Sequence, residues 1–172
     1  MRAWLDYKTA YEKQASFYLA RPWSVKLLKL LNLLFTGVFI VAYGVLLYLA
    51  FKKNYPPLAQ TKIIALPACT LLSVPPLRML FCRLRPYDEK GANITPLLVK
   101  KHKDNDSFPS RHLASAFVLC FAFVAYLPPL SAIFFPIALG LGYIRFALGL
   151  HYPTDLLGGM VLGSIFGIFF LI

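Results

Sequence analysis

Five long apolar stretches constrain this sequence more strongly than any other feature. They cover residues 27–51, 63–77, 113–127, 130–148 and 156–172. A helix that crosses a bilayer needs roughly 20 predominantly apolar residues, and these stretches approach or reach that length. Only 15% of the residues are charged, whereas soluble proteins carry about a quarter. The pattern predicts an all-α integral membrane bundle with about five transmembrane helices.

Two polar regions accompany the apolar stretches. Residues 1–22 mix aromatic and charged side chains and predict an amphipathic helix at the membrane interface. They contain no apolar run of the kind found in a cleavable signal peptide. Residues 83–107 predict a polar loop on the headgroup side, in which His102 is a solvated residue within a basic run. Because nothing resembles a linker or a repeat, we expect residues 1–172 to form a single membrane-embedded domain.

The net charge of +11 indicates an anionic partner. Nucleic acid is excluded, because the basic residues lie between the apolar stretches and do not form one soluble face. Lipid headgroups or an anionic substrate fit this distribution better. The three cysteines lie in or beside apolar runs, which is typical of small buried side chains rather than of a disulfide or metal site.

Tracing five crossings brings four helix ends to the same membrane face. These are the end of the second stretch, the start of the third, the end of the fourth and the start of the fifth. The chemically unusual residues of the sequence lie at these four places. We therefore expect a functional site at this face.

The third stretch opens with the sequence Phe-Pro-Ser-Arg-His, residues 108–112. Ser110 is a plausible N-cap, and a helix N-terminus is a ready site for phosphate because its backbone N–H groups are unpaired. His112 lies in the first turn, close to any anion that this terminus binds. An interfacial histidine with no chemical role is the alternative interpretation.

The fifth stretch opens with His151 and Asp155, and Arg145 lies near the end of the fourth. Pro153 suits the first helical position. From the first turn, Asp155 can accept the proton on one ring nitrogen of His151, which leaves the other nitrogen free to attack an electrophile. This is the orienting logic of a catalytic triad with histidine as the nucleophile. The alternative is that both residues merely cap a helix.

Arg78 and Arg85 are seven residues apart, which predicts one helical face that ends at Pro86. The planar guanidinium group matches the oxygens of a phosphate. Arginines that converge with Arg145 beside a single acid indicate that an anion supplies the missing charge. The alternative is that they anchor the helix by reaching to the interface. Arg83 falls off this face and is predicted to be an interface anchor.

These residues together resemble the type 2 phosphatidic acid phosphatase superfamily, whose signatures are KxxxxxxRP, PSGH and SRxxxxxHxxxD. The chain has Arg78-x6-Arg85-Pro86, then Pro109-Ser110-Arg111-His112, then Arg145-x5-His151-x3-Asp155. Their order and internal spacing agree with the family, and the resemblance covers residues from about 63 to 172.

The resemblance implies a role for each matching residue. His151 attacks phosphorus and forms a phosphohistidine, with Asp155 holding its ring. His112 protonates the leaving group and then activates water. The remaining residues hold the phosphoryl oxygens; they are Arg78, Arg85, Ser110, Arg111 and Arg145. No metal or other cofactor is implied, because the arginines neutralise the charge.

Three positions depart from the family signatures. Arg78 replaces lysine, Arg111 replaces glycine and Ile144 replaces serine. The first keeps the charge, the second places a large cation beside the site, and the third removes a hydroxyl donor. The predicted nucleophile and acid are unchanged, so we expect activity with an open preference for the lipid headgroup.

The leading hypothesis is metal-independent hydrolysis of a lipid phosphate. Candidate substrates are undecaprenyl pyrophosphate, phosphatidylglycerol phosphate, phosphatidic acid and a phosphorylated glycolipid. The small chain looks bacterial, which favours the first two. Alternatives are a phosphotransferase that uses a second lipid as acceptor, and a non-catalytic lipid-binding or transport protein. Vanadium haloperoxidases share the signatures, but five apolar stretches argue against a soluble oxidase.

Two indicators disagree about the side of the membrane that bears the site. With five crossings the N-terminus and the site share a side, and most lysines and arginines also lie there. The positive-inside rule therefore predicts the cytoplasmic side. The family resemblance implies the extracytoplasmic face of the cell membrane, which we adopt. Neither the lipid nor the oligomeric state follows from the sequence.

Overall fold

Six helices make up the described part of the chain in the computed structural model, which covers residues 2–88, 92–98 and 107–172, with side chains from residue 7 onward. They are α1 (Arg2–Leu19), α2 (Pro22–Lys52), α3 (Pro57–Phe81), α4 (Arg111–Tyr126), α5 (Pro128–Ala147) and α6 (Pro153–Ile168). No strand occurs in these ranges. The basic run around His102 lies outside the described residues. The predicted all-α class is confirmed.

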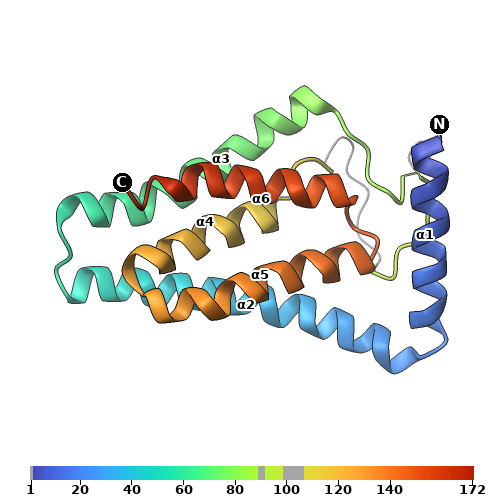
Figure 1. Ribbon diagram of the computed structural model, residues 1–172, viewed down its shortest axis with the longest axis horizontal. Coiled ribbons are helices and arrows are strands. Elements are labelled where there is room, and N and C mark those ends of the chain that lie inside the picture. Colours follow the sequence, from blue (N-terminus) through green and yellow to red (C-terminus); the bar gives the residue numbers. More distant parts are fainter. Residues whose placement is uncertain (1, 89–91, 99–106) are drawn as a thin grey trace.

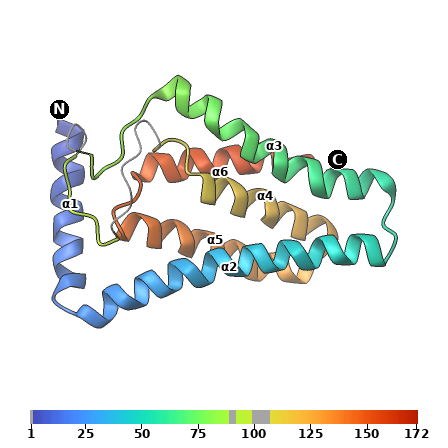
Figure 2. The same ribbon diagram turned by 180° about the vertical axis from the view of Figure 1, so that it is seen from behind.

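Helices α2 to α6 lie lengthwise in one bundle, and α1 lies across one end of it (Figures 1 and 2). Three of them, α2, α3 and α5, are long and apolar enough to cross a membrane, while α4 and α6 are shorter apolar helices. Large apolar side chains face outward; Ile40 is 69% exposed and Leu72 is 72% exposed. An exterior of this kind is suited to lipid rather than to water.

Proline sets the start of four helices. Pro22, Pro57, Pro128 and Pro153 are the first residues of α2, α3, α5 and α6. The missing N–H of proline is harmless there, because the first N–H groups of a helix have no partner within it. Ser110 occupies the N-cap position of α4. The predicted starts at Ser110 and Pro153 are therefore confirmed.

Pro75 and Pro76 form a pair of the kind that breaks or kinks a helix, yet α3 continues unbroken through Pro67, Pro75 and Pro76. Proline removes one backbone hydrogen bond, and a membrane helix can continue when a neighbour satisfies the freed carbonyl. One such replacement is present, since the Tyr43 hydroxyl donates to the carbonyl of Ile63 at 3.2 Å, four residues before Pro67. The green end of α3 diverges from the bundle in both ribbon views (Figures 1 and 2).

The end of α3 also differs from the prediction. The helix ends at Phe81, and Cys82 takes a left-handed conformation with φ 43°. Arg85 therefore lies in a non-helical segment and does not share a helical face with Arg78. Pro86 does not end the helix, because the left-handed residue has already turned the chain away.

Helices α4 and α6 pack closely because α6 presents glycine to α4. A Cβ atom on Gly159 would lie 2.5 Å from the carbonyl oxygen of Ser110, and one on Gly163 would lie within contact of the carbonyl of Ala114. Side chains at these two positions would force the helices apart. Small residues thus allow close packing of these two membrane-protein helices. This packing brings the start of α4 against the start of α6.

A second buried cluster fixes α1 to the bundle end. Tyr11 is 1% exposed and packs with residues of the 92–98 segment and the α5–α6 turn. Its hydroxyl donates to the carbonyl of Thr95 at 3.2 Å. Gly149 makes the tight α5–α6 turn possible, because its φ of +75° is a conformation that glycine adopts without strain.

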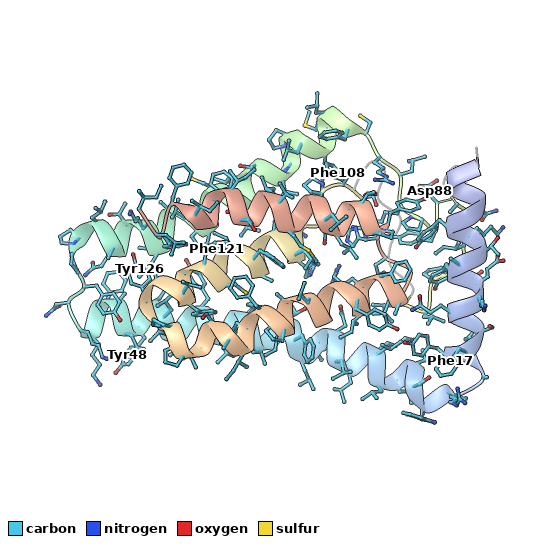
Figure 3. The ribbon with its side chains drawn as sticks, in the orientation of Figure 1. Phe17, Tyr48, Asp88, Phe108, Phe121 and Tyr126 are labelled. Carbon is cyan, nitrogen blue, oxygen red and sulfur yellow. The ribbon has the colours of Figure 1, made fainter. Side chains whose placement is uncertain are left out.

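The ends of α3 and α5 and the starts of α4 and α6 lie toward the same end of the molecule, the end that α1 crosses (Figure 1). Phe108 and Asp88 lie toward this end, while Tyr48 and Tyr126 lie at the opposite one (Figure 3). The predicted convergence of four helix ends is therefore confirmed.

Candidate active site

His151 lies in the turn between α5 and α6 and is almost completely buried, with 1% of its surface exposed. Its Nδ1 atom is 3.0 Å from the backbone carbonyl oxygen of Ser107. Because a carbonyl oxygen can only accept, Nδ1 carries the proton and donates it. The Nε2 atom of the neutral ring then holds a lone pair, which is the form that a nucleophile or a base requires.

The acceptor of this proton differs from the prediction. Asp155 was expected to take it, but its Oδ2 atom is 3.7 Å from Nδ1 of His151. That separation exceeds hydrogen-bond distance. The carboxylate therefore acts on the ring through its charge and through Ser107, whose hydroxyl donates to the same Oδ2 atom.

Asp155 is fully buried, and several groups hold its carboxylate. Besides the Ser107 hydroxyl, Oδ2 accepts from the backbone N–H of Tyr152 at 2.9 Å. This bond caps the first turn of α6. Asp155 therefore caps the helix and also lies beside His151. Oδ1 forms an ion pair with Nη1 of Arg83 at 2.9 Å. A buried carboxylate requires such partners, because its desolvation is costly.

Burial controls the protonation of His151. Burial is the largest cause that lowers the pKa of the ring, the positive charges of Arg145 and Arg85 add to the lowering, and Asp155 opposes it; the resulting pKa is about 3. The imidazole is therefore neutral at physiological pH, and its Nε2 lone pair is available.

The start of α4 lies directly against this region. The backbone N–H of Ser110 donates to the carbonyl of Asp155 at 2.9 Å, which ties the α4 N-terminus to α6. The Ser110 hydroxyl is completely buried and has no hydrogen-bond partner among the described residues. A buried polar group without a partner is rare. It is the arrangement expected where a ligand oxygen completes the bond.

Four arginines gather at this end of the bundle. Arg145 lies close enough to Arg78, Arg85 and Arg111 for their positive charges to repel its own. Arg78 is repelled in the same way by Arg85 and Arg111. Arg145 is 1% exposed. Its Nη1 donates to the Asn32 side chain at 3.3 Å, and its Nε has no hydrogen-bond partner among the described residues. Like charges held together in this way favour a multiply charged anion between them.

An apolar cavity of about 290 Å³ opens beside the α4 N-terminus. Arg111 and His112 line it. The rest of its wall is mostly apolar and comes from α2, α3, α4 and α5, with Phe39, Ile40, Leu71, Leu119 and Leu141 among its members. His112 thus lines, together with the cationic Arg111, a cavity whose other walls are mostly apolar.

The described residues contain no group of three or more His, Cys, Asp or Glu side chains spaced to hold a metal ion. The polar groups around the starts of α4 and α6 include guanidinium groups, two histidines and the carboxylate of Asp155. Such a set can bind a phosphate, attack it with a ring nitrogen and exchange protons with it.

Residues 61–172 match the sequence profile of the PAP2 superfamily. The chain belongs to the PAP2 superfamily. The predicted family is therefore confirmed, and the match contains every residue that was predicted to take part in the site.

Named relatives in the superfamily act on lipid A. The lipid A 4′-phosphatase of Bacteroides thetaiotaomicron is 30% identical over 144 residues, which make up 77% of this chain and 64% of that protein. The lipid A 1-phosphatase of Rhizobium johnstonii is 33% identical over 67 residues, or 39% of this chain and 28% of that protein. This chain therefore spans less than two thirds of the length of these relatives.

Solved PAP2 structures share the fold. Aquifex aeolicus LpxE superimposes with a TM-score of 0.65 and 25% identity, over 84% of this chain and 86% of that one. A transmembrane PAP2-type phosphatidylglycerolphosphate phosphatase from Bacillus subtilis gives a TM-score of 0.66 at 22% identity, over 95% and 84% of the two chains. The shared fold agrees with the three helices of this chain that are long and apolar enough to cross a membrane.

In this PAP2 protein, three residues that contact the predicted site residues were not predicted to belong to the site. Arg83 was predicted to be an interface anchor, which is wrong, because it pairs with buried Asp155. Ser107 contacts both His151 and Asp155, and Asn32 contacts Arg145. The available signals were weak. Asn32 is a single asparagine inside the first apolar stretch, which is typical of an intramembrane polar contact. No sequence pattern identifies Arg145 as its partner.

Proposed function

We propose that this protein hydrolyses a membrane lipid phosphate through a phosphohistidine formed on His151. One observation carries the proposal: buried His151 donates its Nδ1 proton to Ser107, which leaves Nε2 as a nucleophile beside a group of arginines. A histidine that served only as structural filler would not need a fixed tautomer next to several cations.

In the first step, Nε2 of His151 attacks phosphorus and a P–N bond forms. The P–O bond to the lipid breaks at the same centre, and His112 gives its proton to the departing oxygen. The ring of His151 becomes positively charged during the attack, and the carboxylate of Asp155 at 3.7 Å stabilises that charge.

In the second step, His112 takes a proton from a water molecule, whose oxygen attacks phosphorus. The P–N bond breaks, inorganic phosphate leaves and His151 returns to its neutral form. One water is consumed for each lipid alcohol and phosphate released. General acid–base catalysis of this kind contributes roughly 10²- to 10⁴-fold to rate.

Arg78, Arg85, Arg111, Arg145 and Ser110 would hold the phosphoryl oxygens. Their support is the mutual proximity of the arginine charges and the buried atoms of Ser110 and Arg145 that have no partner among the described residues. Fixed donors aimed at a developing charge are worth about 3–4 kcal/mol each in other enzymes. No resident metal or cofactor is part of this proposal.

A lipid substrate is supported by the cavity beside His112. Arg111 and His112 line it together with mostly apolar side chains, so a phosphate beside these two residues and an acyl or prenyl chain along the apolar wall would each meet suitable groups. Among the candidate lipids, the named relatives favour a phosphorylated glycolipid of the lipid A type. Undecaprenyl pyrophosphate, phosphatidylglycerol phosphate and phosphatidic acid remain the comparison substrates.

The chain is proposed to act as one membrane-embedded domain, with residues 1–22 at the interface and the site at the extracytoplasmic face. Asn93 is exposed near the α1 end of the site, so Asn93→Cys can report its side. The native cysteines Cys69 and Cys82 are exposed and would first be replaced by serine. Labelling of intact cells by a membrane-impermeant thiol reagent is expected. Labelling only after lysis would place the site at the cytoplasmic side.

Phosphate release from a panel of these lipids, in the presence of EDTA, tests the function. We expect release from at least one lipid, and His112→Ala should reduce it by roughly 10²-fold or more. Arg21→Ala, a substitution at an exposed residue, serves as the control and should leave the rate unchanged. Absence of release from every lipid would contradict the hydrolase proposal, and complete loss in EDTA alone would contradict a metal-independent mechanism.

A further inference from the structure

Arg83 makes three contacts with the start of α6. Its Nη1 atom pairs with Oδ1 of Asp155 at 2.9 Å and donates to the Thr154 hydroxyl at 2.6 Å. Its guanidinium carbon also lies 4.5 Å from the centre of the Tyr152 ring. All three partners lie within four residues of His151, so the Arg83 side chain contacts the turn that carries the proposed nucleophile at three points.

The contacts of Arg83 continue to the ring of His151 through Asp155 and Ser107. Asp155 accepts from the Ser107 hydroxyl, and the carbonyl of Ser107 accepts from Nδ1 of His151. The backbone N–H of Ser107 in turn donates to the carbonyl of Arg83 at 3.2 Å. The segments around residues 83 and 107 are therefore joined to each other as well as to α6.

The position of Arg83 also distinguishes it from the arginines that surround the proposed phosphate site. Nη1 pairs with Asp155 and donates to Thr154, and the guanidinium carbon lies over the Tyr152 ring, so these interactions are directed at protein. Arg145, by contrast, keeps a buried Nε with no partner among the described residues. Arg83 also lies outside the signature positions Arg78 and Arg85.

We propose that Arg83 is a positioning residue, which holds Asp155 and Ser107 in place and thereby fixes the ring of His151. The expected effect on kcat rests on the proposed phosphatase function, whereas the expected effect on the position of the His151 ring does not. Removing one member of a largely buried ion pair leaves the other without compensation. Asp155 would then rearrange, and Ser107 would lose the bond that orients it.

The kinetic test compares Arg83→Ala with Arg83→Lys and with the surface control Arg21→Ala. Partners that orient a functional histidine typically change activity by about 10–100-fold. Arg83→Ala is expected to lower kcat by such a factor with little change in KM. Arg83→Lys should recover part of the loss, because an ammonium can still pair with Asp155. A rise in KM with unchanged kcat would overturn the inference in favour of substrate binding.

A double-mutant cycle with Asp155→Asn separates positioning from an independent effect. If Arg83 acts through Asp155, adding Arg83→Ala to Asp155→Asn should lower kcat by less than about twofold more. A full further 10–100-fold loss would overturn the inference. A wild-type protein that releases no phosphate from any lipid would contradict the proposed function instead.

The positioning itself can be read without activity. The chain has three histidines, so ¹⁵N-labelled imidazole signals can be assigned by single substitution. Wild type should show His151 with a slowly exchanging proton on Nδ1. That proton should exchange faster in Arg83→Ala and keep its protection in Arg21→Ala. Unchanged exchange in folded Arg83→Ala would overturn the inference whatever lipid the protein hydrolyses.

Discussion

Ser107 offers its backbone carbonyl oxygen to Nδ1 of His151 at 3.0 Å, and this contact fixes the chemical form of the histidine. A backbone carbonyl cannot donate, so the proton must reside on Nδ1. The nearby carboxylate of Asp155 is too distant to accept it. It instead holds the Ser107 side chain, and the two residues together orient the ring.

The depressed pKa of His151 makes the stability of the protein depend on pH. In the unfolded chain the imidazole takes up a proton as the pH falls through about 6.5, whereas the folded form resists it down to about 3. The unfolded state therefore binds more protons within this window, and stability falls with falling pH by up to about 1.4 kcal/mol per unit.

Thermal unfolding in detergent between pH 6.5 and 4 measures this effect. We expect His151→Gln to reduce the pH slope, because glutamine does not titrate there. His112→Gln provides the comparison, since that residue is only half-buried. Equal slopes for wild type and His151→Gln would show that the buried ring does not stay neutral.

Arg145→Lys should impair catalysis although it preserves the charge. Lysine lacks the planar fork of the guanidinium and cannot bond Asn32 and a phosphoryl oxygen in the same geometry. Loss of a fixed donor corresponds to about 3–4 kcal/mol, or roughly 10²- to 10³-fold in kcat/KM. Initial rates across lipid concentrations measure it. A rate within twofold of wild type would argue against a phosphate-binding role.

Gly163→Ala should destabilise the bundle, while Gly37→Ala should not. A Cβ at residue 163 meets the carbonyl of Ala114, whereas nothing lies within 4 Å of one at residue 37. Forcing an extra carbon into a tight contact costs about 1–3 kcal/mol. Melting temperatures of the two variants in one detergent compare the effects. Equal values would mean that the α4–α6 contact tolerates separation.

Much of the site was predictable because it lies at helix ends, and residues typical of helix starts mark those ends in the sequence. Pro153 and Ser110 locate the starts of α6 and α4, and the apolar stretches fix which ends share a face. Once those ends converge, the two histidines, Asp155 and the arginines must come together. The apolar stretches also predict the all-α fold class.

What could not be predicted depends on irregular backbone and long-range contacts. Cys82 takes a left-handed conformation that rotates Arg83 toward α6, and no local pattern signals it. Ser107 contributes through its carbonyl, which every residue possesses. Pro75 and Pro76 would usually break or kink a helix, yet α3 continues through both.

Trapping the phosphate on the protein tests the central claim most directly. Wild type would be mixed briefly with a ³²P-labelled lipid that it hydrolyses and quenched in alkali, under which a P–N bond to histidine survives. The account predicts acid-labile label on the peptide that contains His151, and neither label nor phosphate release in His151→Ala. Label on a different residue, or release from His151→Ala at the wild-type rate, would contradict it.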